Sequence, residues 1–198
     1  MCILFNGDIV YYINCFFVYS IIGYFMEMVF GICIGSNASS GVLYGPWTFI
    51  YGFASLIIIF VSDKLFYKLH LNRVLKTIII LFILTFLITF LEFLGGISIE
   101  YFFGFSFWDY SNRPFHLGKY VCLPFALLWG VLSLFFIYFL RPFIDKFIYK
   151  IPSFVTYILV LLFCIDLIIR FLVEYGCCKF LNFGVFTKLS FFVIILGE

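Results

Sequence analysis

The chain has 198 residues, of which 66% are hydrophobic, 25% aromatic and only 11% charged. Soluble domains use roughly 45–50% apolar and about 25% charged residues, so this composition excludes an ordinary soluble domain. The net charge of +2 is too small and too dispersed for a nucleic-acid-binding surface, because the basic residues form short clusters between apolar runs. We therefore expect an integral membrane protein: an all-α, polytopic bundle that forms a single domain over residues 1–198.

Five apolar runs are predicted to span the bilayer, since a hydrocarbon core about 30 Å thick needs roughly 20 apolar residues per helix. They are residues 9–34, 46–61, 76–99, 120–140 and 153–175, and the second is short. No basic residue precedes the first run and no A-x-A cleavage site follows it, so we expect a retained span rather than a signal peptide. A sixth apolar stretch at 189–196, within the terminal residues 180–198, is too short to span alone and is either interfacial or re-entrant.

The basic residues predict the orientation of these spans. The loops after the second and fourth spans carry seven: Lys64, Lys68, Arg73, Lys76, Arg141, Lys146 and Lys150. The loop between the third and fourth spans has only Arg113 and Lys119. Because cytoplasmic loops are enriched in Lys and Arg, we expect the N-terminus inside and the C-terminus outside.

Ionisable side chains occur within the predicted spans, where a charge costs roughly 2.5–3.5 kcal/mol at a helix centre. Glu27 lies in the first span, Glu92 in the third and Glu100 at the end of the third. In the predicted orientation all three belong to the middle or outer half of the membrane. Small and polar residues share a helix face with them, namely Ser20, Gly23 and Gly31 in the first span and Thr85, Thr89 and Gly96 in the third. These faces are either packing seams or the walls of a polar site.

The fifth span contains Asp166, Arg170 and Glu174 at i, i+4 and i+8. This spacing places the three side chains on one helix face, where the arginine can pair with both acids. We interpret the group as a structural ion pair. In the alternative, Arg170 meets Glu27 or Glu92 across the bundle.

Two segments outside the spans carry distinctive residues. The first contains Tyr44-Gly45-Pro46-Trp47 and leads into Tyr51-Gly52, a pattern typical of a tight turn and a helix start, with aromatic residues that also suit the membrane interface. The second is Trp108-Asp109-Tyr110-Ser111, which follows Glu100. Asp109 and Ser111 are also ordinary turn residues, so a purely local turn stays an alternative there.

These motifs together resemble the family known as Putative ABC-transporter type IV, small bacterial membrane proteins labelled as permeases. The resemblance covers about residues 17–145 and rests on the motifs above together with Leu43, Ile50, Cys122-Leu123 and Trp129-Gly130. The chain departs from the family pattern at Ser39-Ser40, where Asn-Arg is expected, and at His116, where Asn is expected. Gly118-Lys119 stands where a Gly-Arg pair is expected.

The resemblance implies a permease-like protein of the bacterial cell membrane, and the predicted orientation places its acidic site toward the outside. The residues expected to bind substrate are Glu27, Glu92, Glu100, Trp108, Asp109, Tyr110 and Ser111, with Tyr44, Tyr51 and Trp47 at the mouth. The chain has no G-x-x-x-x-G-K-[ST] phosphate loop. ATP-driven transport would therefore need a separate cytoplasmic ATPase, docked on residues 63–76 or 143–150. The other partners expected are the lipid bilayer and a second copy of the chain.

Two other functions are compatible with the residues. A metal-dependent hydrolase or transferase would use Glu92, Glu100, Asp109 and His116 as ligands or acid–base groups. No HExxH or CxxC spacing is present and the seven cysteines are odd in number, so neither a metal, a cofactor nor a disulfide framework is indicated. A non-catalytic assembly or lipid-interaction protein would use its buried charges only to fix helix register.

Overall fold

The computed structural model describes residues 2–33, 42–68, 70–104, 106 and 108–174, and these are mostly helical. The α-helices are α1 (Cys2–Cys33), α2 (Phe49–Lys68), α3 (Arg73–Phe103), α4 (Leu123–Phe135), α5 (Arg141–Ile148) and α6 (Ser153–Glu174). A π-helical turn, Phe136–Leu140, joins α4 to α5. The strands β1 (His116–Leu117) and β2 (Val121–Cys122) form an antiparallel hairpin in which His116 is opposite Cys122.

Within the described residues, four helical segments are long and apolar enough to cross a membrane: Ile9–Cys33, Arg73–Phe102, Leu123–Ile148 and Ser153–Val173, with mean hydropathy from 1.8 to 2.7. The sequence also predicts a span at 46–61, the second in chain order. In the structure that region belongs to α2, which is not among the four and carries Asp63 and Lys64. The apolar stretch at 189–196 lies outside the described residues.

The ends of α2 and α3 are set by local hydrogen bonds. The helix α2 begins at Phe49 rather than at residue 46, because the preceding segment is bound to α1, where the Thr48 N–H donates to the Ser20 carbonyl at 3.1 Å. The Asn72 side chain caps the start of α3 by accepting from the Leu75 N–H at 2.8 Å. At the other end Gly104 has a φ of 71° and ends the helix in the left-handed conformation that glycine adopts without strain.

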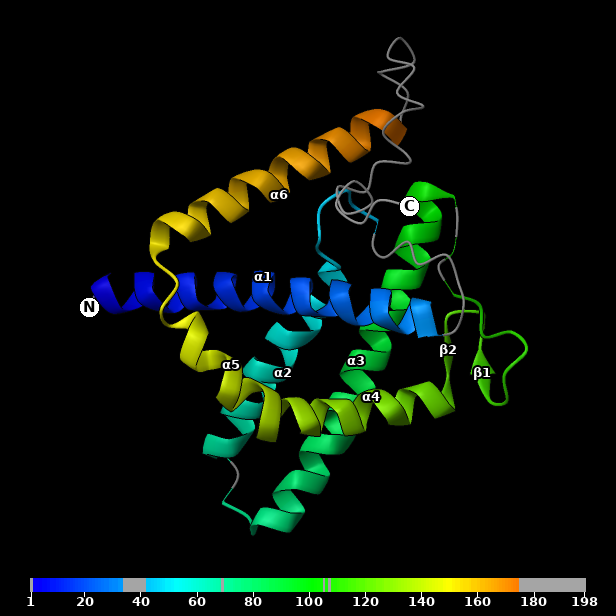
Figure 1. Ribbon diagram of the computed structural model, residues 1–198. Coiled ribbons are helices and arrows are strands. Elements are labelled where there is room, and N and C mark those ends of the chain that lie inside the picture. The colour runs from blue at the N-terminus through cyan, green and yellow to red at the C-terminus, as the bar shows by residue number, and fades with distance from the viewer. Residues whose placement is uncertain (1, 34–41, 69, 105, 107, 175–198) are drawn as a thin grey trace.

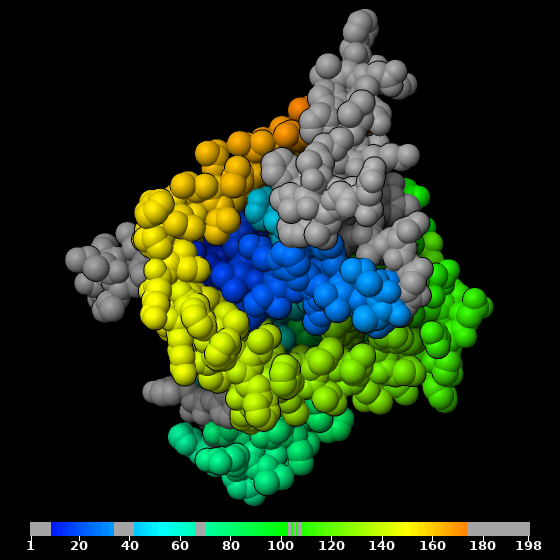
Figure 2. Space-filling view, viewed as in Figure 1, coloured from blue at the N-terminus to red at the C-terminus, as the bar shows by residue number. Residues whose placement is uncertain are grey.

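The helices form a bundle in which α1 packs along α2, α2 on α3 and α3 on α4, while α6 contacts α1 from the other side (Figure 1). Figure 2 shows α1, in blue, exposed between α6 above it and α4 below it. Glycines allow the close approaches, as the sequence suggested for packing seams. A side chain at Gly52 would collide with Ser20 and Phe16 of α1, and one at Gly130 would collide with Thr85 of α3.

The segment from α4 to α5 is one continuous helix with a widened turn in its middle. Pro142 has no N–H to donate to the carbonyl four residues earlier, and the π-helical turn lies directly before it. The expected end of the fourth span at residue 140 is therefore not the end of the helix, which continues to Ile148.

An ion-pair cluster closes the end of the bundle where α2 and α5 meet. The Arg141 guanidinium donates to both carboxylate oxygens of Asp63, at 2.6 and 2.9 Å, and its Nε lies 3.3 Å from Asp145. The Tyr11 hydroxyl of α1 donates to Asp145 at 3.1 Å. This bidentate arrangement holds three helices together and lies in the region predicted to be cytoplasmic.

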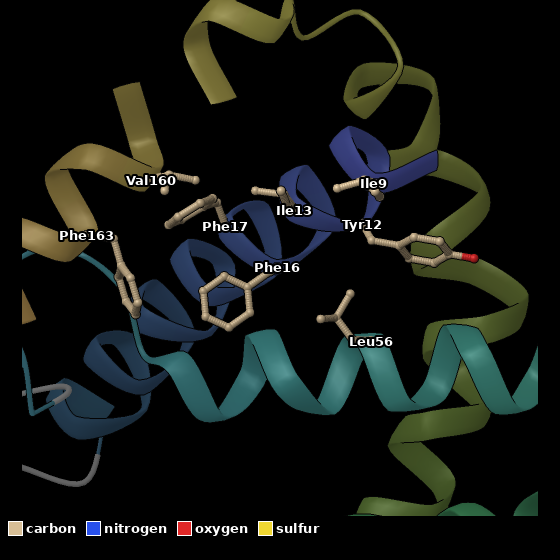
Figure 3. Close-up of a pocket in the computed structure, with 8 residues that line it drawn as sticks. All are labelled: Ile9, Tyr12, Ile13, Phe16, Phe17, Leu56, Val160 and Phe163. Carbon is tan, nitrogen blue, oxygen red and sulfur yellow. The ribbon is translucent and has the colours of Figure 1, made fainter. Parts of the chain in front are cut away.

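An apolar groove of about 350 Å³ lies between α1, α2 and α6 (Figure 3). Its lining residues come mainly from the N-terminal half of α1, with Leu56 of α2 and Val160 and Phe163 of α6. The only polar atom among these side chains is the Tyr12 hydroxyl, and Figure 3 shows it pointing away from the other seven residues. The groove therefore offers no hydrogen-bonding group to a ligand.

Candidate functional site

A second cavity, of about 380 Å³, lies between α1, α2, α3 and α4 beneath the loop that carries the hairpin. We refer to it as the acidic cavity, because Glu27 of α1 and Glu92 of α3 both line it. Five of the residues predicted from sequence to form the site are in its wall: Glu27, Tyr51, Glu92, Trp108 and Tyr110. Most of the remaining lining is apolar, as in other small-molecule pockets.

Glu92 is the most buried of the cavity carboxylates, with only 6% of the residue exposed. The Tyr110 hydroxyl donates to its Oε1 at 3.2 Å, whereas Oε2 is buried and has no hydrogen-bond partner among the described residues. The buried indole N–H of Trp129, another lining residue, makes no full hydrogen bond among the described residues, although it lies close enough to the Glu92 carboxylate to interact with it. An acceptor and a donor are thus available in one cavity for a bound molecule.

Glu27 enters the cavity from α1, one helical turn beyond Gly23. It lies close enough to the Tyr51 hydroxyl of α2 to interact with it electrostatically. A side chain at Gly23 would collide with the Tyr51 ring, so this glycine allows the ring to lie against α1. The Tyr51 ring in turn lies 6.3 Å from that of Trp129, edge to face.

The loop between α3 and α4 covers the acidic cavity. Tyr110 stacks on Phe125 of α4 with ring centroids 4.8 Å apart, and its N–H donates to the Lys119 carbonyl at 2.8 Å. The Trp108 indole N–H donates to the Tyr120 carbonyl at 2.9 Å. Burial beside Glu92 raises the pKa of the Tyr110 hydroxyl, so it remains a hydrogen-bond donor at neutral pH.

Glu100 does not line the acidic cavity but anchors the loop. It accepts from the Lys119 ammonium at 2.5 Å and from the Tyr120 hydroxyl at 2.5 Å. Hydrogen bonding to Glu100 raises the pKa of Lys119 and that of Tyr120. Gly96 leaves the space on α3 in which the Tyr120 ring lies.

Asp109 and Ser111 lie on the exposed surface of the loop. The Asp109 carboxylate accepts from the Ser111 N–H at 2.8 Å, which is the local turn that the sequence left as an alternative. This hydrogen bond lowers the pKa of Asp109 below its usual value. Both residues shape the turn that presents Trp108 and Tyr110 to the cavity.

Asp166 of α6 binds the segment before α2. Its carboxylate accepts from the backbone N–H groups of Tyr44 and Gly45, at 3.1 and 2.8 Å, and from the Trp47 indole N–H at 2.7 Å. Tyr44 is therefore in this contact rather than at the acidic cavity, and the Arg170 guanidinium lies 5.8 Å from its ring centroid. The ion pair proposed for Asp166, Arg170 and Glu174 stays a prediction, since the Glu174 side chain lies outside the described residues.

The four residues considered as metal ligands are not brought together. Glu92 is in the cavity, Glu100 binds Lys119, Asp109 is in its turn, and the His116 ring lies 2.8 Å from the Gly118 carbonyl. Among the residues that the structure describes, no group of three His, Cys, Asp or Glu side chains has the arrangement of a metal site. The geometry does not favour the metal-dependent alternative.

The family comparison matches residues 14–175, which is most of the chain. The protein belongs to the Putative ABC-transporter type IV family. The match begins near the expected residue 17 and extends well past 145, so α5 and α6 are part of the family unit. No curated protein and no solved structure matches the chain. Membership in this family, together with the four apolar helices, establishes a membrane protein related to ABC transporters.

Sequence reasoning missed Trp129 and Phe125 as members of the site. Trp129 was noted only as part of a family motif, and Phe125 follows the proline that begins α4. A sequence signal for both exists, because they are aromatic residues near one end of a helix whose Gly130 packs on α3. This signal predicts that Trp129 and Phe125 lie near Glu92 only when α3 and α4 are known to be neighbours.

Proposed function

We propose that this protein is the membrane subunit of a bacterial transporter and holds its cargo in the acidic cavity. A single observation carries the proposal: the buried Glu92 carboxylate, whose Oε2 makes no full hydrogen bond to the described residues, lines a ligand-sized cavity inside the bundle. Burying a carboxylate is costly, so its presence inside the bundle indicates a functional role. Family membership supports transport as that function.

The proposed topology places the acidic cavity toward the outer face of the cell membrane. The α2–α3 connection and the α5–α6 connection carry most of the basic residues, and the Arg141–Asp63 ion pair holds these regions at one end of the bundle. The positive-inside rule makes that end cytoplasmic. The N-terminus is then cytoplasmic, and α2 crosses the membrane as a short fifth span between α1 and α3.

Alkaline phosphatase fusions test this topology directly. A fusion after Asn112, in the exposed loop, is expected to be active, whereas a fusion after Lys150 is expected to be inactive because the enzyme folds only outside the cytoplasm. The opposite pattern would reverse the orientation and place the acidic cavity on the cytoplasmic side.

A separate ATPase is proposed to dock at α5. The ion pair with Asp63 fixes this short helix against α2 and leaves Phe143, Lys146 and Phe147 exposed. Exposed aromatic side chains on a fixed helix are typical of an interaction surface. The chain has no phosphate-binding loop of its own.

The experiment that tests the proposal is purification of the tagged protein from its native membrane in a gentle detergent, with mass spectrometry of what remains bound. We expect a protein with a G-x-x-x-x-G-K-[ST] motif, and we expect its recovery to fall at least fivefold in F143A/F147A. The matched control is Phe139→Ala, an exposed aromatic on the preceding π-helical turn. Absence of any such ATPase from an intact, folded preparation would contradict the proposal.

A further inference from the structure

We infer that the acidic cavity binds an amphipathic organic cation, an ammonium group on an apolar body that also carries an acceptor oxygen, and that this molecule enters from the bilayer between α1 and α4. The inference rests on the proposed function, because it names the substrate class of the same cavity. It stands on the charge, the unsatisfied polar atoms and the rim of that cavity.

The charge of the lining selects a cation. Glu27 and Glu92 both contribute carboxylates, and the described lining contains no lysine, arginine or histidine. Charges interact far more strongly in a desolvated site than in water, so two acids attract a cation and repel an anion there. The nearest ion pair in the loop, Lys119 with Glu100, is outside the lining and internally neutralised.

The unsatisfied atoms specify the polar groups of the ligand. Oε2 of Glu92 needs a donor, and an ammonium supplies N–H groups that form short, charge-assisted hydrogen bonds with carboxylates. The Trp129 indole N–H lies close to the Glu92 carboxylate without making a full hydrogen bond to it, so an ammonium that occupies Oε2 leaves this N–H to donate to an ether, hydroxyl or carbonyl oxygen of the same ligand. One molecule with both groups satisfies the two polar atoms of the cavity lining that make no full hydrogen bond among the described residues.

The walls of the cavity suit both the cation and its apolar body. Five aromatic residues surround the carboxylates: Tyr51, Trp108, Tyr110, Phe125 and Trp129. The faces of such rings attract cations, and their area is favourable for burying hydrocarbon. A volume of about 380 Å³ is at the small end of the range for drug-sized ligands.

The rim shows the route of entry. On the α1 side it is formed by Met26 and Phe30, which are 46% and 63% exposed, and on the α4 side by Leu128 and Leu132, at 45% and 37%. Both helices are candidate spans, so their exposed apolar side chains face lipid. Figure 2 views the face on which α1 lies above α4 with a hollow between them. A cavity that opens sideways favours a molecule that partitions into the bilayer first.

The test is binding of a matched series to the full chain in nanodiscs of phosphatidylcholine, with empty nanodiscs subtracted. The probe is 4-phenoxybutylamine. It is compared with 4-phenoxybutanol, which lacks the charge, with 5-phenoxypentanoate, which reverses it, and with 5-phenylpentylamine, which lacks the oxygen. We expect the amine to bind at least tenfold more tightly than the alcohol, the acid not to bind, and loss of the oxygen to weaken binding about threefold.

Two variants assign the binding to the proposed atoms. E92Q should weaken 4-phenoxybutylamine about tenfold and change the alcohol less than twofold. W129F should weaken the phenoxy amine but not 5-phenylpentylamine. The matched control is Phe163→Leu in the apolar groove, which should change neither. Equal binding of amine and alcohol to the wild-type protein, or an unchanged amine affinity in folded E92Q, would overturn the inference, and the wild-type series decides alone if E92Q does not fold.

The outcomes separate this inference from the proposed function. A protein that selects the amine but has no ATPase partner and moves nothing across a liposome membrane refutes transport and leaves the ligand class standing. A protein that copurifies with an ATPase but prefers the alcohol or the acid refutes only the ligand class.

Discussion

The acidic cavity and the apolar groove are similar in volume, about 380 and 350 Å³, and α1 lines both. The N-terminal half of α1 contributes Ile9 to Phe17 to the groove, whereas its C-terminal half contributes Met26, Glu27 and Phe30 to the acidic cavity. One wall is entirely apolar, and the other contains two carboxylates and an indole N–H. Volume alone therefore does not identify a binding site, and the converging polar atoms distinguish the two.

The groove has a structural explanation that the acidic cavity lacks. Phe163 of α6 makes edge-to-face ring contacts with Phe16 and Phe17 of α1, at 5.6 and 5.7 Å. Such contacts hold α6 against the bundle, and lipid can fill the remaining space without any loss of hydrogen bonds. In the acidic cavity, by contrast, an empty site leaves buried polar atoms without partners.

The largest effect is expected from Gly130→Val, which acts on the acidic cavity alone. The new side chain would collide with Thr85 and force α4 away from α3, at a cost of about 3 kcal/mol. We expect lower thermal stability in nanodiscs and loss of amine binding. The matched control is Leu127→Val on the exposed face of α4, which should change little. A stable Gly130→Val protein that still binds the amine would show that the α3–α4 contact does not shape the cavity.

Asp166→Asn should act on the groove side instead. Asparagine cannot accept all three hydrogen bonds that Asp166 accepts, and the loss is expected to cost about 2 kcal/mol because a buried charge-assisted bond is broken. Hydrogen exchange should show lower protection of the Tyr44 and Gly45 amides, with amine binding retained. Cys164→Ser, an exposed change on the same helix, is the control. Unchanged protection would mean that Asp166 does not hold this segment.

A pair of tyrosine variants compares the two cavities with the same chemical change. Tyr51→Phe removes the hydroxyl near Glu27 and is expected to weaken 4-phenoxybutylamine about threefold, whereas Tyr12→Phe should have no effect on binding. Equilibrium titration of both variants in nanodiscs makes the comparison. Equal losses would mean that ligand binding does not discriminate between the cavities.

The smallest effect is expected from pH on the loop that covers the acidic cavity. The Ser111 hydrogen bonds lower the pKa of Asp109. Its contribution to the stability of the folded loop is therefore complete above about pH 3.8 and is lost as pH falls through the lower pKa of the folded state. The pKa of Lys119 is raised. Its contribution to the stability of the folded loop is therefore complete below about pH 10.5 and is lost as pH rises through the higher pKa of the folded state. Fluorescence of Trp108 should be flat from pH 5 to 9. D109N should remove the fluorescence change at acid pH, and K119Q should remove the change at alkaline pH. A fluorescence transition near pH 7 would contradict both assignments.

The helices and half of the candidate site were predictable from sequence. The lengths of the apolar runs located the candidate spans. The free-energy cost of placing a charge in the membrane drew attention to Glu27 and Glu92, which do line one cavity. The segment at Trp108 and Tyr110 was distinctive because its aromatic residues follow a span closely. These are local sequence signals, which can be interpreted without knowledge of the fold.

The partners of the other charges were not predictable, because they are distant in sequence. The i, i+4 spacing favoured Arg170 as a partner of Asp166, and it gave no sign that this carboxylate also accepts hydrogen bonds from the amides of Tyr44 and Gly45, more than a hundred residues earlier. Glu100 likewise meets Lys119 across a hairpin whose path depends on Gly118. Periodicity describes one helix face and does not reveal which backbone groups another segment will present to it.

Two polar residues of α6, Asp166 and Thr156, bear on how the bundle assembles during synthesis. This helix leaves the ribosome after the other described helices, and its mean hydropathy of 2.4 is sufficient for insertion even with Asp166 exposed to lipid. When α6 docks, Asp166 is no longer exposed to lipid, because its carboxylate accepts hydrogen bonds from the amides of the segment before α2. Thr156 also donates to Asn14 at 2.7 Å. A chain whose segment before α2 is misfolded would leave α6 with an unsatisfied carboxylate in the bilayer, so correct folding of that segment is a condition for stable docking of α6.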